Sequence, residues 1–373
     1  MSCVSFSIAV PVYKQANFLP SALESIRVQA QNVQIAVMDA TPNDSVQAVL
    51  SKYREILHYE RHGQDSGQAS AIQEGWDHTD GEILAWLCAD DYLFPDALDA
   101  VRAVFVNYPD VDVVYGDSVF VNELNHFIGY FPEINSDISS ILKGDCISQP
   151  SCFVRRSALE TIGGLNTKLH YIMDWDLWTR LYRSGAKFHY LNKPLSVVRM
   201  HADTKTSSRS SRRFLEIARH LWRNTTKTAV VKSLIGFYYQ DLLSFPATGY
   251  ERYILKFFNF YRNQKRKYQK ICNANEHYKY GLSLYDNEAK ATVDVLMPWY
   301  NKHPPVMLRI GCDMETSPDV RLNTVSLSTD SGNRFSYTIP QIDLSSHLLH
   351  LQVSSPIDHL WHLHFVDFHD GTP

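Results

Sequence analysis

Residues 6–39 read FSIAVPVYKQANFLPSALESIRVQAQNVQIAVMD, and this stretch decides the fold class. Its two ends, Phe6–Val12 and Val33–Asp39, are short runs rich in β-branched residues, which predicts two strands. Between them, Phe18–Ala30 carries Leu19, Leu23 and Ile26 at helical spacing. The stretch therefore predicts a strand–helix–strand unit of the kind that builds parallel sheets.

The same alternation continues to residue 116. Further strands are predicted at Ile56–Tyr59, Ile83–Cys88 and Asp112–Gly116, and further helices at Ser45–Tyr53, Gln68–Trp76 and Pro95–Asn107, the last with proline in its first turn. This pattern predicts an α/β fold with a mostly parallel sheet and helices on both faces. Ligands of such sheets bind beyond the carboxyl ends of the strands. We therefore expect four segments to converge there: Pro11–Tyr13, Asp39–Asp44, Gly63–Ser70 and Cys88–Tyr92.

The remainder of the chain changes character twice. A hairpin is predicted at Ser118–Tyr130 and a helix at Asp174–Ser184, whereas residues 205–270 are basic and helical in spacing. From residue 276 onward, short alternating runs predict a small all-β module, a β-sandwich: Val293–Leu296, Val306–Ile310, Val325–Ser328 and Leu348–Val353. The predicted organisation is a catalytic domain over 1–204, a basic amphipathic helical region over 205–275 and the all-β module over 276–373.

Composition excludes several classes of protein. The chain has 373 residues, with 36 Lys and Arg, 40 Asp and Glu, and a formal charge of −4. This balance argues against a dedicated nucleic-acid-binding protein, whose surface would be strongly basic. A hydrophobic share of 45% excludes a chain that is mainly disordered.

Three further features predict a cytoplasmic location. The N-terminal residues lack the basic and apolar regions of a signal peptide. The chain contains no run of 18 apolar residues, so no membrane span is predicted. The six cysteines are scattered without a CxxC motif, so we expect free thiols and neither a disulfide framework nor a zinc site.

The first glycine of the chain is Gly63, so the first strand is not followed by the glycine-rich turn that dinucleotide-binding and P-loop folds need. A bound diphosphate would then need a metal ion held by carboxylates. Asp90 and Asp91, which directly follow a predicted buried strand, supply them. The alternative is that one of them caps the next helix and the other is solvated.

Motifs are spaced along residues 5–205 at Ala9–Tyr13, Asp39 with Asp44, Gln64–Ile72, Trp86–Tyr92, Tyr115–Asp117, Gln149–Arg156, Met173–Trp178 and Arg199–His201. Together they resemble those of the family 2 glycosyltransferases of the GT-A fold, especially the bacterial O-antigen and capsule polysaccharide branch. A single motif of this kind is weak, but this many in order is specific. The resemblance implies an enzyme that uses a nucleotide-sugar donor.

The resemblance implies a donor site made by the first strand ends. Pro11, Val12 and Tyr13 would form the wall of the nucleobase pocket, and Asp39 would accept the imide N–H of uracil. Asp65 and Gln68 would lie in the same donor region, where Gly67 permits close approach of the backbone. The alternatives are that these residues, Val12 above all, only end a core strand and that Asp39 caps the next helix, a role that suits Asp44 better.

The resemblance also implies a metal, Mn²⁺ or Mg²⁺, on the donor diphosphate. Cys88 stands at the first position of the family's DxD motif, so Asp91 is the main expected ligand and Asp90 would contact the ribose or a metal-bound water. His201 would reach the metal or the diphosphate, although a lone histidine is more often structural. Arg199 would neutralise the leaving diphosphate.

Asp174 matches the general base of the family, with Met173 where a glutamate is usual. It begins a predicted helix, whose dipole keeps a carboxylate ionised but equally suits a simple cap. Asp176 points elsewhere on the helix and is expected to pair with Arg180. One base opposite a departing nucleoside diphosphate implies a single displacement that inverts the anomeric carbon.

On the acceptor side, the resemblance implies contacts from Gln149 and Arg155, with Arg156 beside it. Trp175 is expected to stack on sugar, and Trp178 is expected to lie in the core. The acceptor would be a saccharide, in the expected case lipid-linked.

Residues 205–270 hold fifteen Lys and Arg against three acids. Basic, aromatic helices of this kind predict contact with an anionic membrane surface, which would make the protein peripheral on the inner face. The alternative is a helical hairpin packed on the catalytic domain with solvated charges. The all-β module could bind glycan, cover the helices or contact a partner chain in an oligomer.

The leading hypothesis is thus an inverting, metal-dependent hexosyltransferase that extends a surface polysaccharide from a UDP-sugar. Cys88 and Met173 depart from the family motifs and leave open a catalytically silent protein that binds nucleotide sugar or glycan. A nucleotidyltransferase is a third hypothesis, weakened by the missing glycine-rich turn.

Overall fold

A computed structural model describes most of the chain. The described residues are 4–29, 32–131, 137–201, 204, 210–244, 278–283, 287–289, 291–300, 304–314, 316–330, 333–342, 345–355 and 361–369. The predicted apolar stripe at Tyr253, Phe257 and Tyr261 lies outside them.

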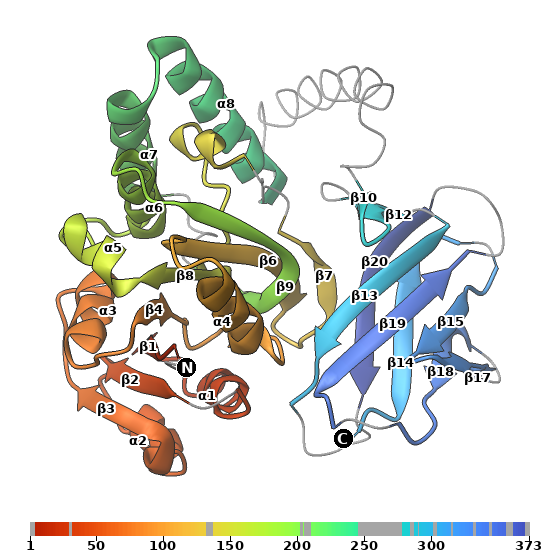
Figure 1. Ribbon diagram of the computed structural model, residues 1–373. Helices are drawn as coiled ribbons and strands as arrows, with labels where there is room; N and C mark the ends of the chain where they lie inside the picture. The colour runs from red at the N-terminus through yellow and green to blue at the C-terminus, as the bar shows by residue number, and fades with distance from the viewer. Residues whose placement is uncertain are drawn as a thin grey trace.

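The N-terminal half forms the predicted α/β domain (Figure 1). Its strands are β1 (Phe6–Val12), β2 (Val33–Asp39), β3 (Leu57–His62), β4 (Ile83–Trp86), β5 (Tyr92–Leu93), β6 (Val113–Asn122), β7 (Phe127–Tyr130), β8 (Cys152–Arg155) and β9 (Phe188–Met200). Its helices are α1 (Leu19–Arg27), α2 (Ser45–Leu50), α3 (Gln68–Asp77), α4 (Ala97–Asn107), α5 (Arg156–Thr161) and α6 (Met173–Arg183), with 3₁₀ turns η1 (Arg54–Ile56), η2 (Ile138–Leu142) and η3 (Gln149–Ser151). Most elements predicted from the sequence are confirmed to within a few residues. The predicted strand Asp112–Gly116 instead continues to Asn122 and includes the first strand of the predicted hairpin, and β5, β8 and β9 were not predicted.

The central sheet runs β7-β6-β8-β4-β1-β2-β3. Strands β4, β1, β2 and β3 are parallel, β8 is antiparallel to both of its neighbours, and β9 pairs in parallel with β6. Successive residues of β1 enter different cores: Ile8 and Val10 pack with α1, α2 and α4, whereas Ala9 packs with α3 and α6. The predicted helices on both faces are therefore confirmed.

Helix α4 begins later than its sequence predicts. Asp96 occupies the N-cap position with φ +57°, a left-handed conformation, and the first helical residue is Ala97. The prediction that Pro95 lies in the first turn is therefore wrong, because the left-handed Asp96 separates the proline from the helix.

Two helices, α7 (Ser211–Asn224) and α8 (Lys227–Ser244), follow the α/β domain. Ile217 and Leu221 are buried against that domain, while Phe214, Leu215 and Trp222 are 45–63% exposed. Helix α7 therefore packs on the domain, as the hairpin alternative predicts, yet leaves apolar side chains at the surface. None of the helices in the described part of the chain has the length and hydropathy needed to cross a bilayer.

The C-terminal module is the predicted β-sandwich. Its strands are β10 (Tyr278–Lys279), β11 (Leu282–Ser283), β12 (Glu288–Ala289), β13 (Thr292–Pro298), β14 (Met307–Cys312), β15 (Asp319–Leu322), β16 (Val325–Leu327), β17 (Thr329–Asp330), β18 (Asn333–Thr338), β19 (Leu348–Ser354) and β20 (Trp361–His369). The sheet β13-β19-β15-β16 lies across β14 and β20 (Figure 1). Alternate residues of β13 and β19 are buried, which is the pattern of a sheet with one face in a core.

The module is joined to the α/β domain. Strand β20 pairs with β7 at Val366 and Phe127, so the sheet continues from one part into the other. The hydroxyl of Tyr300 donates to the carbonyl of Leu93 over 2.6 Å, and Leu93 lies two residues after Asp91. The module therefore contacts the segment that carries the predicted metal ligands.

Gly81→Ala is expected to destabilise the α/β domain. A Cβ atom on Gly81 would lie 2.5 Å from the carbonyl carbon of Phe6, and backbone in a central strand cannot move aside. Overpacking of this kind costs about 1–3 kcal/mol of unfolding free energy. Urea unfolding measures it, with Gly144→Ala as control because nothing lies within 4 Å of a Cβ there. Equal midpoints for both variants would contradict the packing described.

His220 is expected to make stability fall in acid. The side chain is 5% exposed and lies 3.1 Å from Thr179 Oγ1, and burial lowers its pKa from 6.5 to about 4. Between pH 6.5 and pH 4 the imidazole of His220 is protonated in the unfolded chain but not in the folded chain. The unfolding free energy therefore drops as pH falls through this range.

The unfolding free energy falls by at most about 3.5 kcal/mol from this cause. We expect His220→Gln to show a smaller difference in unfolding free energy between pH 7 and pH 4.5 than the wild type, measured by urea unfolding. His58→Gln, at an exposed position, should keep the wild-type difference. An unchanged difference in the His220 variant would refute the assignment.

Candidate active site

The loop after β4 gathers three potential metal ligands. Cys88 Sγ and carboxylate oxygens of Asp90 and Asp91 lie within 4.8 Å of one another. The loop leads into β5, which pairs with β9, so the end of β9 comes alongside. There the backbone N–H of Arg199 donates to Asp91 Oδ1 over 3.1 Å, and His201 Nε2 lies 2.8 Å from Asp90 Oδ2. We call Cys88–Asp91 the acidic loop.

The acidic loop carries buried negative charge that is only partly compensated. Asp90 and Asp91 are each 7% exposed, and Asp90 Oδ1 has no hydrogen-bond partner among the described residues. Burial, and next the charge of Asp90, raise the pKa of Asp91 well above its usual range; the N–H of Arg199 offsets part of this. Close carboxylates with an orphaned oxygen fit a divalent cation such as Mg²⁺ or Mn²⁺, which prefers oxygen ligands.

Two glutamines hold the thiol of the acidic loop. Gln68 Nε2 donates to Cys88 Sγ over 3.2 Å, and the thiol donates to Gln149 Oε1 over 3.7 Å. Gln149 Nε2 also donates to the carbonyl of Trp86 over 2.7 Å. Gln68, expected on the donor side, and Gln149, expected on the acceptor side, are therefore brought together at the acidic loop.

The ends of β1, β2 and β3 place Val12, Asp39 and His62 side by side in register. Asp39 is fully buried; its Oδ1 accepts the N–H of Thr41 over 2.8 Å, and its Oδ2 lies 2.7 Å from His62 Nδ1. Val12 is buried at 3% exposure, and the preceding Pro11 is buried too. His62 was not expected from the sequence, because the third strand was predicted to end at Tyr59, whereas the structure extends it to His62.

Tyr13 follows β1 and is 58% exposed, so its ring is accessible from solvent. The next residue ties the turn to the second strand end, because the N–H of Lys14 donates to Thr41 Oγ1 over 2.8 Å. The Pro11–Tyr13 and Asp39–Asp44 segments thus meet, as expected.

Asp65 shapes the loop between β3 and α3. Its Oδ1 accepts the N–H of Gly67 over 2.8 Å, and Gly67 has φ +115°, a value that favours glycine. Arg61 lies 3.8 Å from Asp65 Oδ2 and binds Glu74 at 2.9 Å. The contact of Asp65 with a donor stays a prediction.

Asp174 lies in the first turn of α6, where its Oδ1 accepts the N–H of Trp175 over 2.8 Å. Its charge is among the causes, after burial and Asp145, that raise the pKa of Cys152 on β8. Asp176 pairs with Arg180 at 2.7 Å, which confirms that expectation. The role of Asp174 as a base remains a prediction.

The expected sugar contact of Trp175 is contradicted by its burial. Trp175 is 2% exposed, its Nε1 donates to the carbonyl of Ile141 over 2.6 Å, and its ring packs on His220 at 4.5 Å. Trp178 is fully buried and stacks on Trp86 at 5.6 Å, as expected. Both tryptophans lie on the inward face of α6, so neither offers a ring to a sugar.

Arg155 also differs from the expectation. Arg155 pairs in register with Ile83, the first residue of β4. The acidic loop follows the other end of β4, after its last residue. Its guanidinium forms an ion pair with Glu82 and lies 4.9 Å from the ring of Phe105. Arg155 therefore lies at the opposite edge of the sheet, where it cannot contact an acceptor at the acidic loop. Arg156 likewise donates to backbone carbonyls, including that of Gly81.

Arg199 supports the acidic loop from inside the protein. It is 2% exposed; its Nη1 donates to the carbonyl of Asp90 over 2.8 Å, and its Nη2 donates to Asn125 Oδ1 over 2.7 Å. The guanidinium also lies 4.6 Å from the ring of Phe18 and 5.3 Å from that of Tyr92. This placement differs from the expected contact with the leaving diphosphate, since every face of the guanidinium is covered by protein.

Residues 7–163 match the model of the family described as Glycosyl transferase family 2, which supports a domain of that family in this part of the chain. An uncharacterized glycosyltransferase of Rickettsia felis is 25% identical over 213 residues, which cover 54% of this chain and 35% of the relative. A PGL/p-HBAD biosynthesis glycosyltransferase of Mycobacterium tuberculosis is 28% identical over 194 residues, which cover 50% and 73%.

The chain spans only about a third of the Rickettsia felis relative and 48% of another uncharacterized glycosyltransferase, from Rickettsia conorii, at 23% identity. Among solved structures, TarS 1-349 of S. aureus in complex with UDP-GlcNAc has a TM-score of 0.50 at 15% identity, covering 66% of this chain and 74% of that one. This similarity supports the GT-A-like fold.

Arg199→Met is expected to destabilise the protein, because it leaves the Asp90 carbonyl and Asn125 Oδ1 buried without their donor. Loss of a buried charged donor costs about 2–4 kcal/mol. Urea unfolding measures the change, and Arg54→Met, at a side chain that is 67% exposed, is the control. Equal stability of the two variants would contradict the supporting role.

Proposed function

We propose that the protein is a metal-dependent glycosyltransferase that moves a hexose-type sugar from a UDP-sugar to a hydroxyl group of a growing surface polysaccharide. The observation that carries the proposal is the acidic loop, a pair of buried carboxylates with an orphaned oxygen inside a family 2 domain. The UDP-GlcNAc complex of TarS, which has the same fold, supports a nucleotide sugar as donor.

The donor would lie along the strand ends that lead to the acidic loop. Pro11, Val12 and the accessible ring of Tyr13 would flank the base. Asp39 would offer its carboxylate to the uracil N–H, for which His62 or Thr41 would have to yield a bond. The loop of Asp65 and Gln68 would close the donor site on the side of α3.

Asp91 would be the main ligand of Mn²⁺ or Mg²⁺, with Asp90 contacting the ribose or a metal-bound water. His201, already 2.8 Å from Asp90, would orient that carboxylate and is a further candidate ligand. When bound, the cation would withdraw charge from the diphosphate and so make it a better leaving group.

In the proposed reaction Asp174 takes the proton of the acceptor hydroxyl as that oxygen bonds to the anomeric carbon of the sugar. The bond between the anomeric carbon and the diphosphate oxygen breaks with its electron pair, and the nucleoside diphosphate leaves. A single displacement of this kind inverts the anomeric configuration. Gln149, held at the acidic loop, would contact the acceptor.

The acceptor class and the cellular location are part of the same proposal. Helix α7 exposes Phe214, Leu215 and Trp222 next to its arginines, which suits an anionic membrane surface and a lipid-linked acceptor. The enzyme would then work in the cytoplasm on the inner face of the plasma membrane, in the O-antigen or capsule type of pathway. The β-sandwich would serve an oligomer.

Asp91→Asn and Asp174→Asn are expected to lower sugar-transfer turnover by at least a hundredfold, because one loses the main metal ligand and the other the base. Release of UDP or GDP from a panel of nucleotide sugars, with Mn²⁺ and an acceptor mixture, measures turnover. Chelation of the metal should have the same effect on the wild type.

Asp110→Asn, at a side chain that is 64% exposed, is the control and should keep full turnover. Undiminished turnover in both active-site variants would overturn the assigned chemistry. Binding of nucleotide sugar by the wild type without any turnover would instead favour the alternative function, a catalytically silent binding protein.

A further inference from the structure

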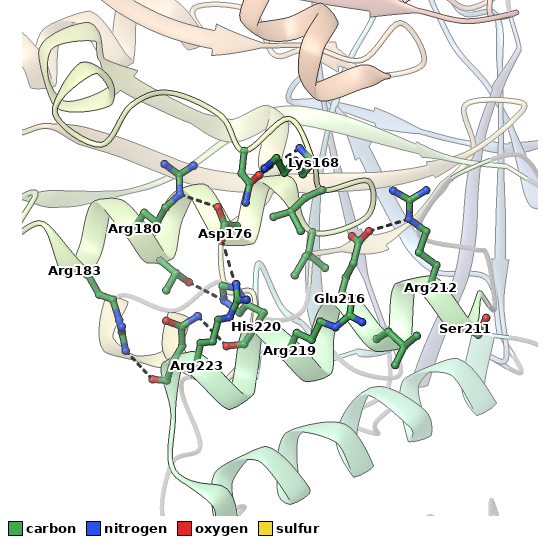
Figure 2. A pocket seen from close by; sticks show the side chains of 16 residues that line it. Lys168, Asp176, Arg180, Arg183, Ser211, Arg212, Glu216, Arg219, His220 and Arg223 are labelled. Atoms are coloured by element: carbon green, nitrogen blue, oxygen red, sulfur yellow. Dashed lines mark hydrogen bonds and ion pairs between the residues drawn. The ribbon is translucent and has the colours of Figure 1, made fainter. Parts of the chain in front are cut away.

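A cavity of about 740 Å³ lies between α6 and α7 (Figure 2). Six basic side chains line it: Lys168, Arg180, Arg183, Arg212, Arg219 and Arg223. The arginines of α7 recur at helical spacing on one face, and they oppose Arg180 and Arg183 on the facing side of α6. The cavity is therefore a concentration of positive charge in a chain whose net charge is −4.

The two acids in the cavity are already engaged. Asp176 pairs with Arg180 at 2.7 Å. Glu216 pairs with Arg212 at 3.2 Å and accepts the N–H of Tyr171 over 2.8 Å. Six bases against two acids leave an excess of four positive charges, and both carboxylates are turned to partners within the wall.

Several cationic donors in the cavity have no acceptor among the residues that the structure describes. Neither Arg219 nor Arg223 makes a hydrogen bond or an ion pair with any residue that the structure describes. Arg180 bonds Asp176 and the carbonyl of Ile162, yet its third nitrogen, Nη2, is buried with no partner among the described residues. A buried guanidinium nitrogen calls for an acceptor oxygen, since leaving it unpaired is costly.

The pKa of His220 responds to the positive charge of the cavity. After burial, the charges of Arg183 and Arg223 are what lower its pKa to about 4, against the opposing effect of Asp176. The imidazole is therefore neutral at pH 7, and the positive charge of the cavity is carried by Lys168 and by the arginines, which stay protonated at all physiological pH values.

We infer that the cavity between α6 and α7 binds a phosphate group through Arg180, Arg183, Arg219 and Arg223. Converging guanidinium groups suit phosphate because each planar fork can donate two parallel hydrogen bonds to its oxygens, and several oxygens can be engaged at once. The shared chemistry is that of a free phosphate compound or of the head group of an anionic phospholipid.

This site is separate from the proposed reaction centre. Asp174 and Asp176 lie about 200° apart around α6, so the proposed base faces away from the cavity. Of the residues named for the proposed function, only Leu215 of the proposed membrane contact lines it; those proposed for the donor, the metal, the base and the acceptor hydroxyl do not. The phosphate site does not depend on the proposed sugar transfer, and each can fail without the other.

Isothermal titration with sodium pyrophosphate in EDTA tests the inference, because without a divalent cation the acidic loop repels the ligand. We expect binding to the wild type and at least tenfold weaker binding to the double variant R219Q/R223Q. The double variant R54Q/R321Q removes the same charge at exposed positions outside the cavity and should bind like the wild type.

A second titration with short-chain dioctanoyl phosphatidic acid distinguishes the two sources of phosphate. Binding of either probe that depends on Arg219 and Arg223 supports the site, and the stronger probe identifies the source. Both arginines are exposed, so we expect wild-type melting temperatures that exclude unfolding as a cause. Absence of binding to the wild type, or equal binding by wild type and R219Q/R223Q, would overturn the inference.

Discussion

The arrangement of the active-site region depends on how two adjacent carboxylates are kept buried and fixed. Asp90 and Asp91 end up almost without solvent because β5 pairs with β9 and draws the acidic loop inward. Arg199 makes this tolerable: its guanidinium binds the backbone of the loop, and its own N–H binds Asp91. These contacts compensate only part of the negative charge of the two buried carboxylates. The uncompensated charge suits a divalent cation.

The two parts of the chain are coupled close to that loop. Tyr300 of the C-terminal module bonds the carbonyl of Leu93 on β5, and its ring packs on Tyr92. A second contact between the two parts is made by Asp117, a buried carboxylate. It accepts a hydrogen bond from the hydroxyl of Tyr190 and forms an ion pair with Lys279 of β10. Through these contacts the β-sandwich braces the same strands that position the acidic loop, so the module is part of the support of the site.

Much of the fold and part of the candidate site were predictable from the sequence, because both follow from local order along the chain. Strands β1 and β2 are encoded by β-branched runs, and α1 by apolar residues at helical spacing. The convergence of Val12 and Asp39, and the acidic loop after β4, follow from the rule that parallel strands end at one edge.

Tertiary structure alone decided which side chains face that edge. Trp175 and Arg155 stand in motifs that suggest contact with a sugar. Trp175 lies on the face of α6 that packs into the core, and Arg155 ends β8 beside the first residue of β4. Arg199 was expected on the diphosphate, but Asn125 and Asp90, 74 and 109 residues away, enclose it. Sequence determined the order of elements, because periodicity is local; the partners of each polar side chain depend on contacts between distant segments, which only packing brings together.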